Sequence, residues 1–121
     1  MSQVILVVED QEDNRRIMRD LLTNSGYEII EAVTGLEGIL AAERVRPGLI
    51  LMDVQLPELD GYEATRRIKA NPDLKGIPII IVTSYALSGD DVKAFEAGCD
   101  AYVSKPFSPR KLLAKVREYL P

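Results

Sequence analysis

Uninterrupted apolar runs alternate along the chain with segments in which apolar residues recur every three or four positions. Apolar runs bounded by turn residues predict strands that are buried on both faces of a parallel sheet. The stretch YEIIEA is more polar than the others and suits an edge strand. The expected strands are residues 4–8, 27–32, 49–52, 77–82 and 101–104.

The segments between these runs predict five amphipathic helices. Their apolar stripes are expected to contain Ile17, Met18, Leu21 and Leu22; Leu36, Ile39 and Leu40; Ala64 and Ile68; Val92 and Phe95; and Leu112, Leu113, Val116 and Leu120. The expected helix starts are Thr34 with Glu37 at capping-box spacing, Asp60, Ser88, and Ser108 before Pro109, and the expected ends are Gly26 and Gly98. With right-handed crossovers, this alternation predicts an α/β fold: a doubly wound, five-stranded parallel sheet with helices on both faces.

Polar residues follow directly after four of the expected strands. In the stretch LILMDVQLPELDG, a buried run leads straight into Asp53. An ionised carboxylate at such a place needs a partner charge or a chemical role. The other strand ends supply Glu9 and Asp10, Thr83 and Ser84, and Ser104 and Lys105. In open parallel sheets ligands bind outside the carboxyl ends of the strands, so we expect these carboxylates, hydroxyls and the ammonium to converge.

Such a set of side chains suits a metal ion and a phosphoryl group. Three carboxylates beside one ammonium cannot all stay ionised at close range without a cation, and oxygen ligands suit Mg²⁺. A bound cation would attract a phosphoryl group, whose oxygens Lys105 and Thr83 can hold while Asp53 attacks phosphorus. Each residue also has an ordinary role as a helix-start, turn or solvent-exposed residue, and only their combination favours chemistry.

Composition narrows the function classes further. The chain has 121 residues, a net charge of −4 and a pI of about 4.9, which favours one domain and disfavours nucleic acid or an anionic membrane as the main partner. No apolar run approaches the roughly 20 residues of a membrane span. Cys99 is the single cysteine, so no internal disulfide forms, and a reducing cytoplasm is expected. The chain has no histidine, which excludes histidine-based catalysis and histidine metal ligands.

The motifs VVED, LILMDVQLPELDG, IIIVTS and AYVSKPF resemble, in this order and spacing, the receiver domain of two-component response regulators, the CheY-like fold. The resemblance covers the whole chain and implies the strand order 2-1-3-4-5. It implies that Asp53 accepts a phosphoryl group. It also implies that Glu9, Asp10 and Asp53, with the backbone carbonyl of Gln55, bind Mg²⁺.

The same resemblance assigns the remaining site residues. Lys105 would contact the phosphoryl group, and the bond from Lys105 to Pro106 is usually cis in this family. Thr83 would be the switch hydroxyl and Tyr102 the switch aromatic. Gln55 and Tyr85 lie at the positions that tune access of the hydrolytic water.

Other protein classes fit the sequence less well. A flavodoxin-type cofactor carrier needs a loop rich in Ser, Thr and Gly after the first strand, where this chain has EDQED, whose carboxylates repel phosphate. A haloacid-dehalogenase-type phosphatase would carry a D-x-D nucleophile there, and no P-loop motif is present. The strongest rival is a receiver-like binding scaffold that does not use phosphate.

We therefore expect residues 1–121 to form one cytoplasmic receiver domain. A sensor histidine kinase or histidine phosphotransfer protein would supply the phosphoryl group, and the face built from the fourth helix, fifth strand and fifth helix would bind a downstream protein. The domain would act as a switch that promotes only its own phosphorylation and dephosphorylation, either as a monomer or as a phosphorylation-dependent dimer. A receiver cut from a larger regulator or hybrid kinase remains the alternative.

Overall fold

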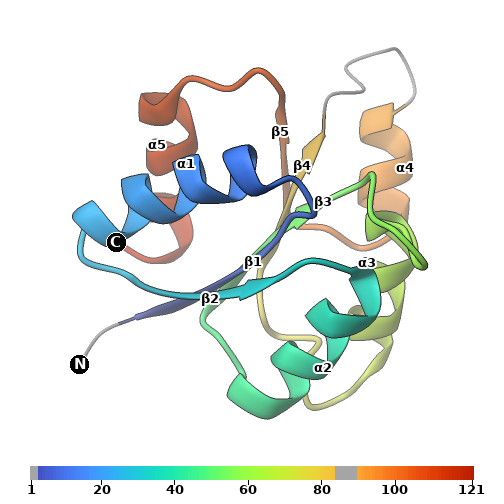
Figure 1. Ribbon diagram of the computed structural model, residues 1–121. Helices are drawn as coiled ribbons and strands as arrows, with labels where there is room; N and C mark the ends of the chain where they lie inside the picture. Colours follow the sequence, from blue (N-terminus) through green and yellow to red (C-terminus); the bar gives the residue numbers. More distant parts are fainter. Residues whose placement is uncertain (1–2, 84–89) are drawn as a thin grey trace.

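The computed structural model describes residues 3–83 and 90–121, which form five parallel strands and five helices (Figure 1). The strand order is β2-β1-β3-β4-β5, as the resemblance implied. The strands are β1 (Val4–Val8), β2 (Glu28–Ala32), β3 (Leu49–Asp53), β4 (Ile79–Thr83) and β5 (Ala101–Ser104). The helices are α1 (Glu12–Asn24), α2 (Gly35–Val45), α3 (Gly61–Ala70), α4 (Asp90–Glu96) and α5 (Pro109–Tyr119). The expected α/β fold is confirmed, and Asp53 and Thr83 prove to be the last residues of their strands.

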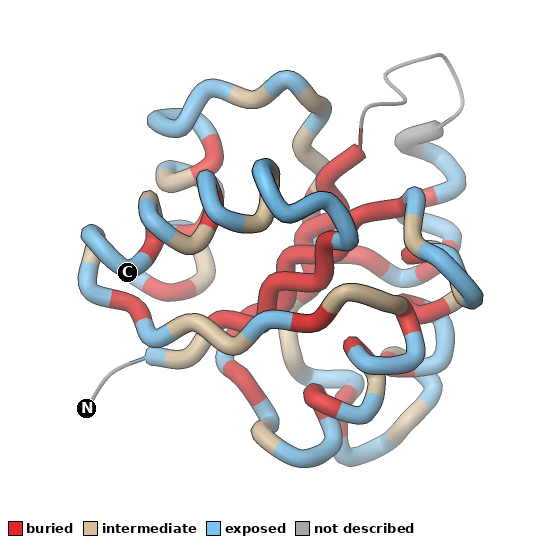
Figure 2. Tube along the Cα trace, viewed as in Figure 1, coloured by how far each residue is buried: buried red, intermediate tan, exposed pale blue. Residues whose placement is uncertain are grey.

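The sheet separates two hydrophobic cores. Helices α1 and α5 cover one face, and α2, α3 and α4 cover the other (Figure 1). Successive residues of each central strand point to opposite faces, so in β1 Ile5 and Val7 pack with α1 and α5, while Leu6 and Val8 pack with α2 and α3. The central strands β1, β3 and β4 are therefore buried on both faces, which explains their continuous apolar runs (Figure 2).

Local sequence sets several helix ends. Helix α1 ends at Asn24, and Gly26 follows the helix as expected; its φ of 97° allows the Tyr27 N–H to bond the Leu22 carbonyl at 3.1 Å. The side chains of Thr34 and Asp60 accept hydrogen bonds from the first turns of α2 and α3, so both cap predictions are confirmed. Ser88, another expected helix start, lies outside the described residues.

The apolar stripes predicted for α2 and α4 are largely wrong. Leu36 and Leu40 are exposed, and α2 instead buries Gly35, Gly38, Ala41 and Ala42. A β-carbon on Gly38 would lie 2.9 Å from Val8 Cγ2, so α2 approaches the sheet too closely for large side chains. Val92 and Phe95 of α4 and Ile17 of α1 are also about half exposed. Small residues form the buried side of α2, which a search for large apolar residues cannot find.

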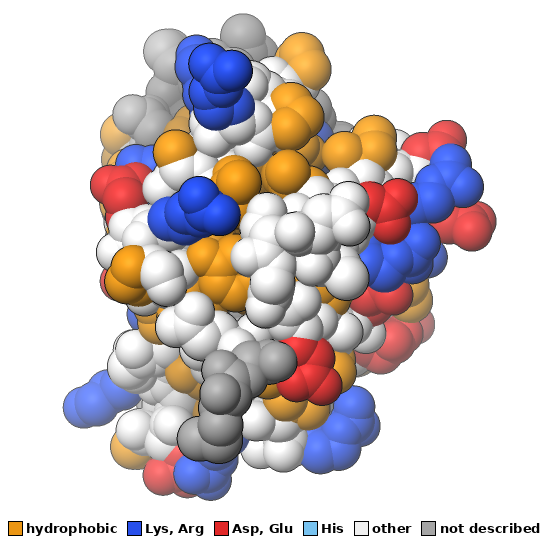
Figure 3. Space-filling model, turned by 90° about the vertical axis from the view of Figure 1, so that its left-hand side faces the viewer, with side chains coloured by type: hydrophobic (Ala, Val, Ile, Leu, Met, Phe, Trp, Pro, Cys, Tyr) orange, Lys and Arg blue, Asp and Glu red, His pale blue; other side chains and the backbone are white. Residues whose placement is uncertain are grey.

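The surface is mixed in character. On the face that carries both ends of the chain, acidic and basic side chains lie next to one another, with hydrophobic side chains interspersed (Figure 3). Among the described residues, no helix has both the length and the apolar character needed to cross a bilayer.

The same substitution at two threonines is expected to have opposite effects on stability. Thr65 of α3 is fully buried, and its hydroxyl has no hydrogen-bond partner among the described residues, so Thr65→Val should raise the free energy of unfolding by about 1 kcal/mol. Thr34→Val removes the cap of α2 and should lower it by about 1 kcal/mol. Urea unfolding midpoints measure both, and a destabilised Thr65→Val variant would show that this hydroxyl is paired.

Candidate functional site

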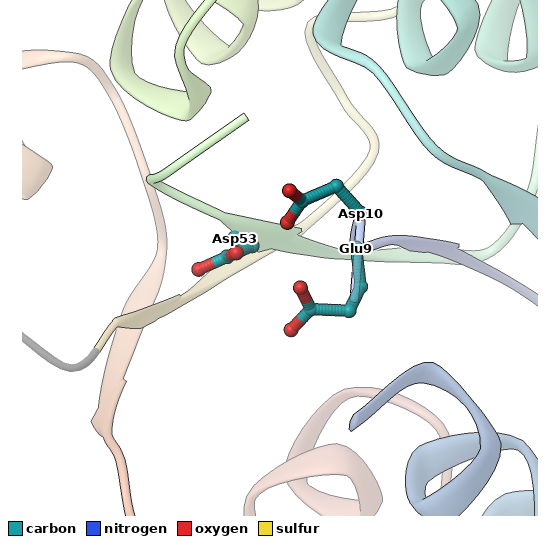
Figure 4. A group of neighbouring side chains, drawn as sticks. All are labelled: Glu9, Asp10 and Asp53. Carbon is teal, nitrogen blue, oxygen red and sulfur yellow. The ribbon is translucent and has the colours of Figure 1, made fainter. Parts of the chain in front are cut away.

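The ends of two neighbouring strands bring three carboxylates together. Glu9 and Asp10 follow β1, and Asp53 ends β3 beside it. One oxygen of each carboxylate lies within 4.8 Å of the other two. All three carboxyl groups point to the same side of the strand ends (Figure 4). The predicted convergence of these residues at one edge of the sheet is confirmed.

Glu9 is fully buried and is held at four of its polar atoms. Its backbone N–H donates to the Ala32 carbonyl at 3.0 Å, and its own carbonyl accepts from Arg15 Nη1 at 3.0 Å. Its carboxylate accepts from the Gln11 N–H at 3.2 Å and from Lys105 Nζ at 2.6 Å. Glu9 is thus a rigid part of the site.

Asp53 is 6% exposed and shares its cationic partner with Glu9. Its Oδ1 accepts from the Val54 N–H at 2.9 Å and lies 3.3 Å from Lys105 Nζ. The Lys105 side chain, 14% exposed, therefore bridges the two buried carboxylates. Breaking a buried ion pair of this kind typically costs about 3–5 kcal/mol, because the remaining charge loses its partner.

The site holds more acidic side chains than basic ones. Burial raises the pKa of Glu9, although the hydrogen bond from Lys105 acts to lower it, and the nearby charge of Asp53 raises it further. Partial desolvation and the adjacent Glu9 carboxylate raise the pKa of Asp10. Burial alone lowers the pKa of Lys105, but the hydrogen bond to Glu9 and the charge of Asp53 outweigh it, so the pKa of the ammonium is raised. One ammonium among three carboxylates leaves an acidic site.

The donor set fits a hard divalent cation. Three carboxylates supply only oxygen ligands, and Asp10 is exposed, so the site is open to solvent on one side. Mg²⁺ prefers such oxygen sites and keeps part of its water shell. A divalent cation would balance the excess negative charge and relieve the penalty that raises the pKa values of Glu9 and Asp10.

Of the other expected site residues, the structure describes Thr83, Tyr102 and Gln55. Thr83 is fully buried at the end of β4, and its carbonyl accepts a hydrogen bond from the Lys105 N–H at 2.6 Å. Tyr102 is half-buried and packs against the core on the α2–α4 side, whereas Val103 packs on the opposite face, as strand alternation predicts. Gln55 is exposed two positions after Asp53. Ser84 and Tyr85 lie outside the described residues. The Lys105–Pro106 bond is cis, as expected.

Sequence reasoning missed two residues that shape the site. Arg15 reaches the backbone of Glu9 from α1. A β-carbon on Gly61 would lie only 1.9 Å from the Asp53 carbonyl oxygen, so the start of α3 packs directly on the backbone of Asp53. The Gly61 N–H also donates to the Val54 carbonyl at 2.9 Å. The one available signal was a glycine in the first helical position after the Asp60 cap, where an ordinary helix former would serve.

Comparisons with known proteins agree with this geometry. The family model for the response regulator receiver domain matches residues 5–117. The chain belongs to the response regulator receiver family. It is 43% identical over 120 residues to the polar-differentiation response regulator DivK of Brucella anthropi, with 99% of this chain and 98% of that protein covered.

Solved receiver structures share the fold closely. The receiver domain of sensor histidine kinase PA1611 from Pseudomonas aeruginosa has a TM-score of 0.92 and 38% identity, with 99% of this chain and 98% of that chain covered, and its structure holds a magnesium ion in the active site cleft. Chemotaxis protein CheY4 of Vibrio cholerae has a TM-score of 0.92 and 25% identity, with 98% and 99% covered. This receiver is therefore a response regulator of two-component signal transduction, a family in which phosphorylation and Mg²⁺ binding are typical.

A methyl group at Gly61 should disturb this receiver more than one at Gly76. Gly61→Ala places a β-carbon against the backbone of Asp53 and Val54, so we expect a loss of about 1–3 kcal/mol in the free energy of unfolding and weaker Mg²⁺ binding. Gly76→Ala is the matched control, because nothing lies within 4 Å of its added β-carbon, and it should change stability by less than about 0.5 kcal/mol. Urea unfolding and Mg²⁺ titration test both variants. Equal stability of the two would contradict the close packing at Gly61.

Proposed function

We propose that residues 1–121 act as one phosphorylation switch in which Asp53 accepts a phosphoryl group from a phosphohistidine of a sensor histidine kinase or histidine phosphotransfer protein. The observation that carries this proposal is the placement of Asp53: its carboxylate lies beside Lys105 and within reach of two further carboxylates. A partner must supply the histidine, because this chain has none. We place the protein in the cytoplasm, where histidine kinases present their phosphohistidine.

The residues of the site divide the work of phosphoryl transfer. Asp10, Asp53 and Glu9, with the backbone carbonyl of Gln55, would hold Mg²⁺, which when bound neutralises the carboxylates and the phosphoryl oxygens. A carboxylate oxygen of Asp53 attacks phosphorus, the bond from phosphorus to the histidine nitrogen breaks, and its electron pair stays on the imidazole. Lys105 and Thr83 hold the oxygens of the transferred group. Gln55, which is exposed two positions after Asp53, would affect how water approaches the acyl phosphate, and so its lifetime.

The donor's approach is favoured by an apolar hollow next to the site. This hollow, of about 450 Å³, is lined by Asn14, Ile17, Lys105, Pro106, Phe107 and Pro109. It adjoins Lys105, whose ammonium contacts Asp53, and Ile17 offers it a half-exposed apolar side chain. We propose that the phosphodonor protein docks here, which brings its phosphohistidine to the open side of the acidic site.

We propose that phosphorylation of Asp53 changes the position of Tyr102 through a movement of Thr83. When the Thr83 hydroxyl is drawn to a phosphoryl oxygen, it vacates space into which the Tyr102 ring can move. The energy available is that of one or two charge-assisted hydrogen bonds, about 1.5–3 kcal/mol each. Such energies support a population shift of roughly tenfold to a few hundredfold. The shift would change the face formed by α4, β5 and α5, where a downstream protein or a second copy binds.

Of two alternatives, only the first has an observation in its favour. The likeness to a receiver that belongs to a sensor histidine kinase fits a domain that works inside a larger regulator equally well. A phosphate-independent scaffold would share the fold but would not need the acidic site and Lys105, and their joint presence favours the phosphoacceptor.

Asp53→Asn should abolish phosphorylation without unfolding the protein. The change is nearly isosteric but removes the nucleophilic charge, so acetyl phosphate with Mg²⁺ should label the wild type at one site and leave the variant unlabelled. Intact-mass measurement detects the addition, and a urea unfolding curve verifies the fold. A phosphoryl group retained by the folded Asn variant would place the acceptor elsewhere.

Ile17→Asp should slow phosphorylation by a protein donor alone. A charge in the apolar hollow disfavours docking, so the rate from a histidine kinase that phosphorylates the wild type should fall at least tenfold, which corresponds to about 1.4 kcal/mol. Labelling by acetyl phosphate should not change, because this donor needs no docking surface. Leu40→Asp is the control, since Leu40 is exposed on α2, across the sheet. Equal rates for the Ile17→Asp variant and the wild type would remove the hollow from the docking proposal.

Thr83→Ala and Tyr102→Ala should separate phosphorylation from its consequence. Both variants should still accept phosphate on Asp53, but each should lose most of the phosphate-dependent gain in binding, whether to a target protein or to a second copy. Affinity for a target and sedimentation velocity, each with and without phosphodonor, measure the two kinds of gain. If either variant keeps the full gain, the coupling does not pass through that residue.

A further inference from the structure

Arg15 connects the acidic site to the edge strand β2. Its Nη1 donates to the Glu9 carbonyl oxygen at 3.0 Å, and its Nε donates to Glu31 Oε1 at 3.1 Å. Glu31 belongs to β2, and its carboxylate also accepts from Arg19 Nη1 at 3.2 and 3.4 Å. The Arg15 side chain is 17% exposed, so its guanidinium is largely withdrawn from water while it makes these contacts.

The position of the accepting carbonyl gives this contact its importance. The Glu9 carbonyl belongs to the peptide group that joins Glu9 to Asp10. Because a peptide group is planar, holding its oxygen restricts ψ of Glu9 and φ of Asp10 together. These two angles set the directions in which the two acidic side chains leave the backbone. The Glu9 N–H is already fixed by the Ala32 carbonyl at 3.0 Å, so Arg15 restrains the next peptide group along the chain.

We propose that Arg15 is a positioning residue for the magnesium site: anchored by Glu31, it holds the peptide group between Glu9 and Asp10 so that both carboxylates face the same cation. This inference rests on the proposed metal site. A guanidinium suits the role because its planar fork can bond the carbonyl and the carboxylate at once, whereas a lysine ammonium on its flexible stem cannot hold both in fixed geometry.

A purely electrostatic role for Arg15 makes the opposite prediction. A positive charge near the acidic site repels a cation, so removing it would strengthen Mg²⁺ binding. A purely structural role as a surface ion pair would contribute little to stability and would leave the affinity for Mg²⁺ unchanged. Metal affinity therefore separates the three roles by the sign of the change.

The test compares Arg15→Met, Arg15→Lys and Arg16→Met with the wild type. Mg²⁺ alone is titrated at constant ionic strength, amide chemical shifts report the dissociation constant, and urea unfolding reports stability. Arg16 is the matched control: it carries the same charge in the same helix, is 57% exposed, and pairs with Asp13. We expect both Arg15 variants to bind Mg²⁺ roughly tenfold more weakly, the lower end of the effect of losing a partner that orients a metal ligand. Arg16→Met should match the wild type.

The outcomes also separate this inference from the proposed metal site. Asp10→Ala should weaken binding in any case, and a wild type that binds no Mg²⁺, or an Asp10→Ala variant with unchanged affinity, would overturn the metal site itself. If Asp10→Ala weakens binding while Arg15→Met matches the wild type or binds more tightly, the site stands and the positioning role is wrong. An Arg15→Lys variant with wild-type affinity would likewise contradict the inference that the planar fork of Arg15 positions this peptide group. Glu31→Gln, which weakens the anchor but leaves Arg15 in place, should give a smaller loss than Arg15→Met.

Discussion

The ammonium of Lys105 lies between two carboxylates that the sheet buries, and the geometry of the strand ends depends on this contact. Nζ is 2.6 Å from Glu9 and 3.3 Å from Asp53, and neither carboxylate has appreciable exposure to water. The three residues come from the ends of β1, β3 and β5, so the bridge ties the middle of the sheet to one edge. Since a buried charge without a partner is costly, these strand ends must stay in register for the charges to be paired.

The same contact leaves the charges of the site unbalanced. Lys105 offsets only part of the negative charge, and burial and mutual repulsion raise the pKa values of Glu9 and Asp10, so ionisation of these two acids is penalised. A bound cation would lower this penalty, and in the proposed function a phosphoryl group would add negative charge beside Lys105. Under the proposed function, the charge balance at the strand ends would couple the bound group to the way the ends of β4 and β5 are held.

Backbone contacts give the site its rigid base. The start of α3 packs on the Asp53 carbonyl at Gly61, and a β-carbon on Gly35 of α2 would lie 2.2 Å from the Leu59 carbonyl oxygen. Residues 54–60 are thus confined between two helix starts, with the Asp53 side chain at the beginning of this loop. On the other side, Arg15 restrains the peptide group after Glu9. Several segments that lie far apart in the chain each fix one part of the acidic site.

The sequence by itself determined the strands, their order along the chain and the polar residues at their ends. Strands buried on both faces need continuous apolar runs, and caps such as Thr34 and Asp60 act within one helical turn, so both signals are local. The tertiary structure alone decided that α2 turns its small residues inward, that Gly61 lies against Asp53, and that Arg15 spans from Glu9 to Glu31. These features depend on distances between segments far apart in the chain, which close packing sets and hydrophobic periodicity does not encode.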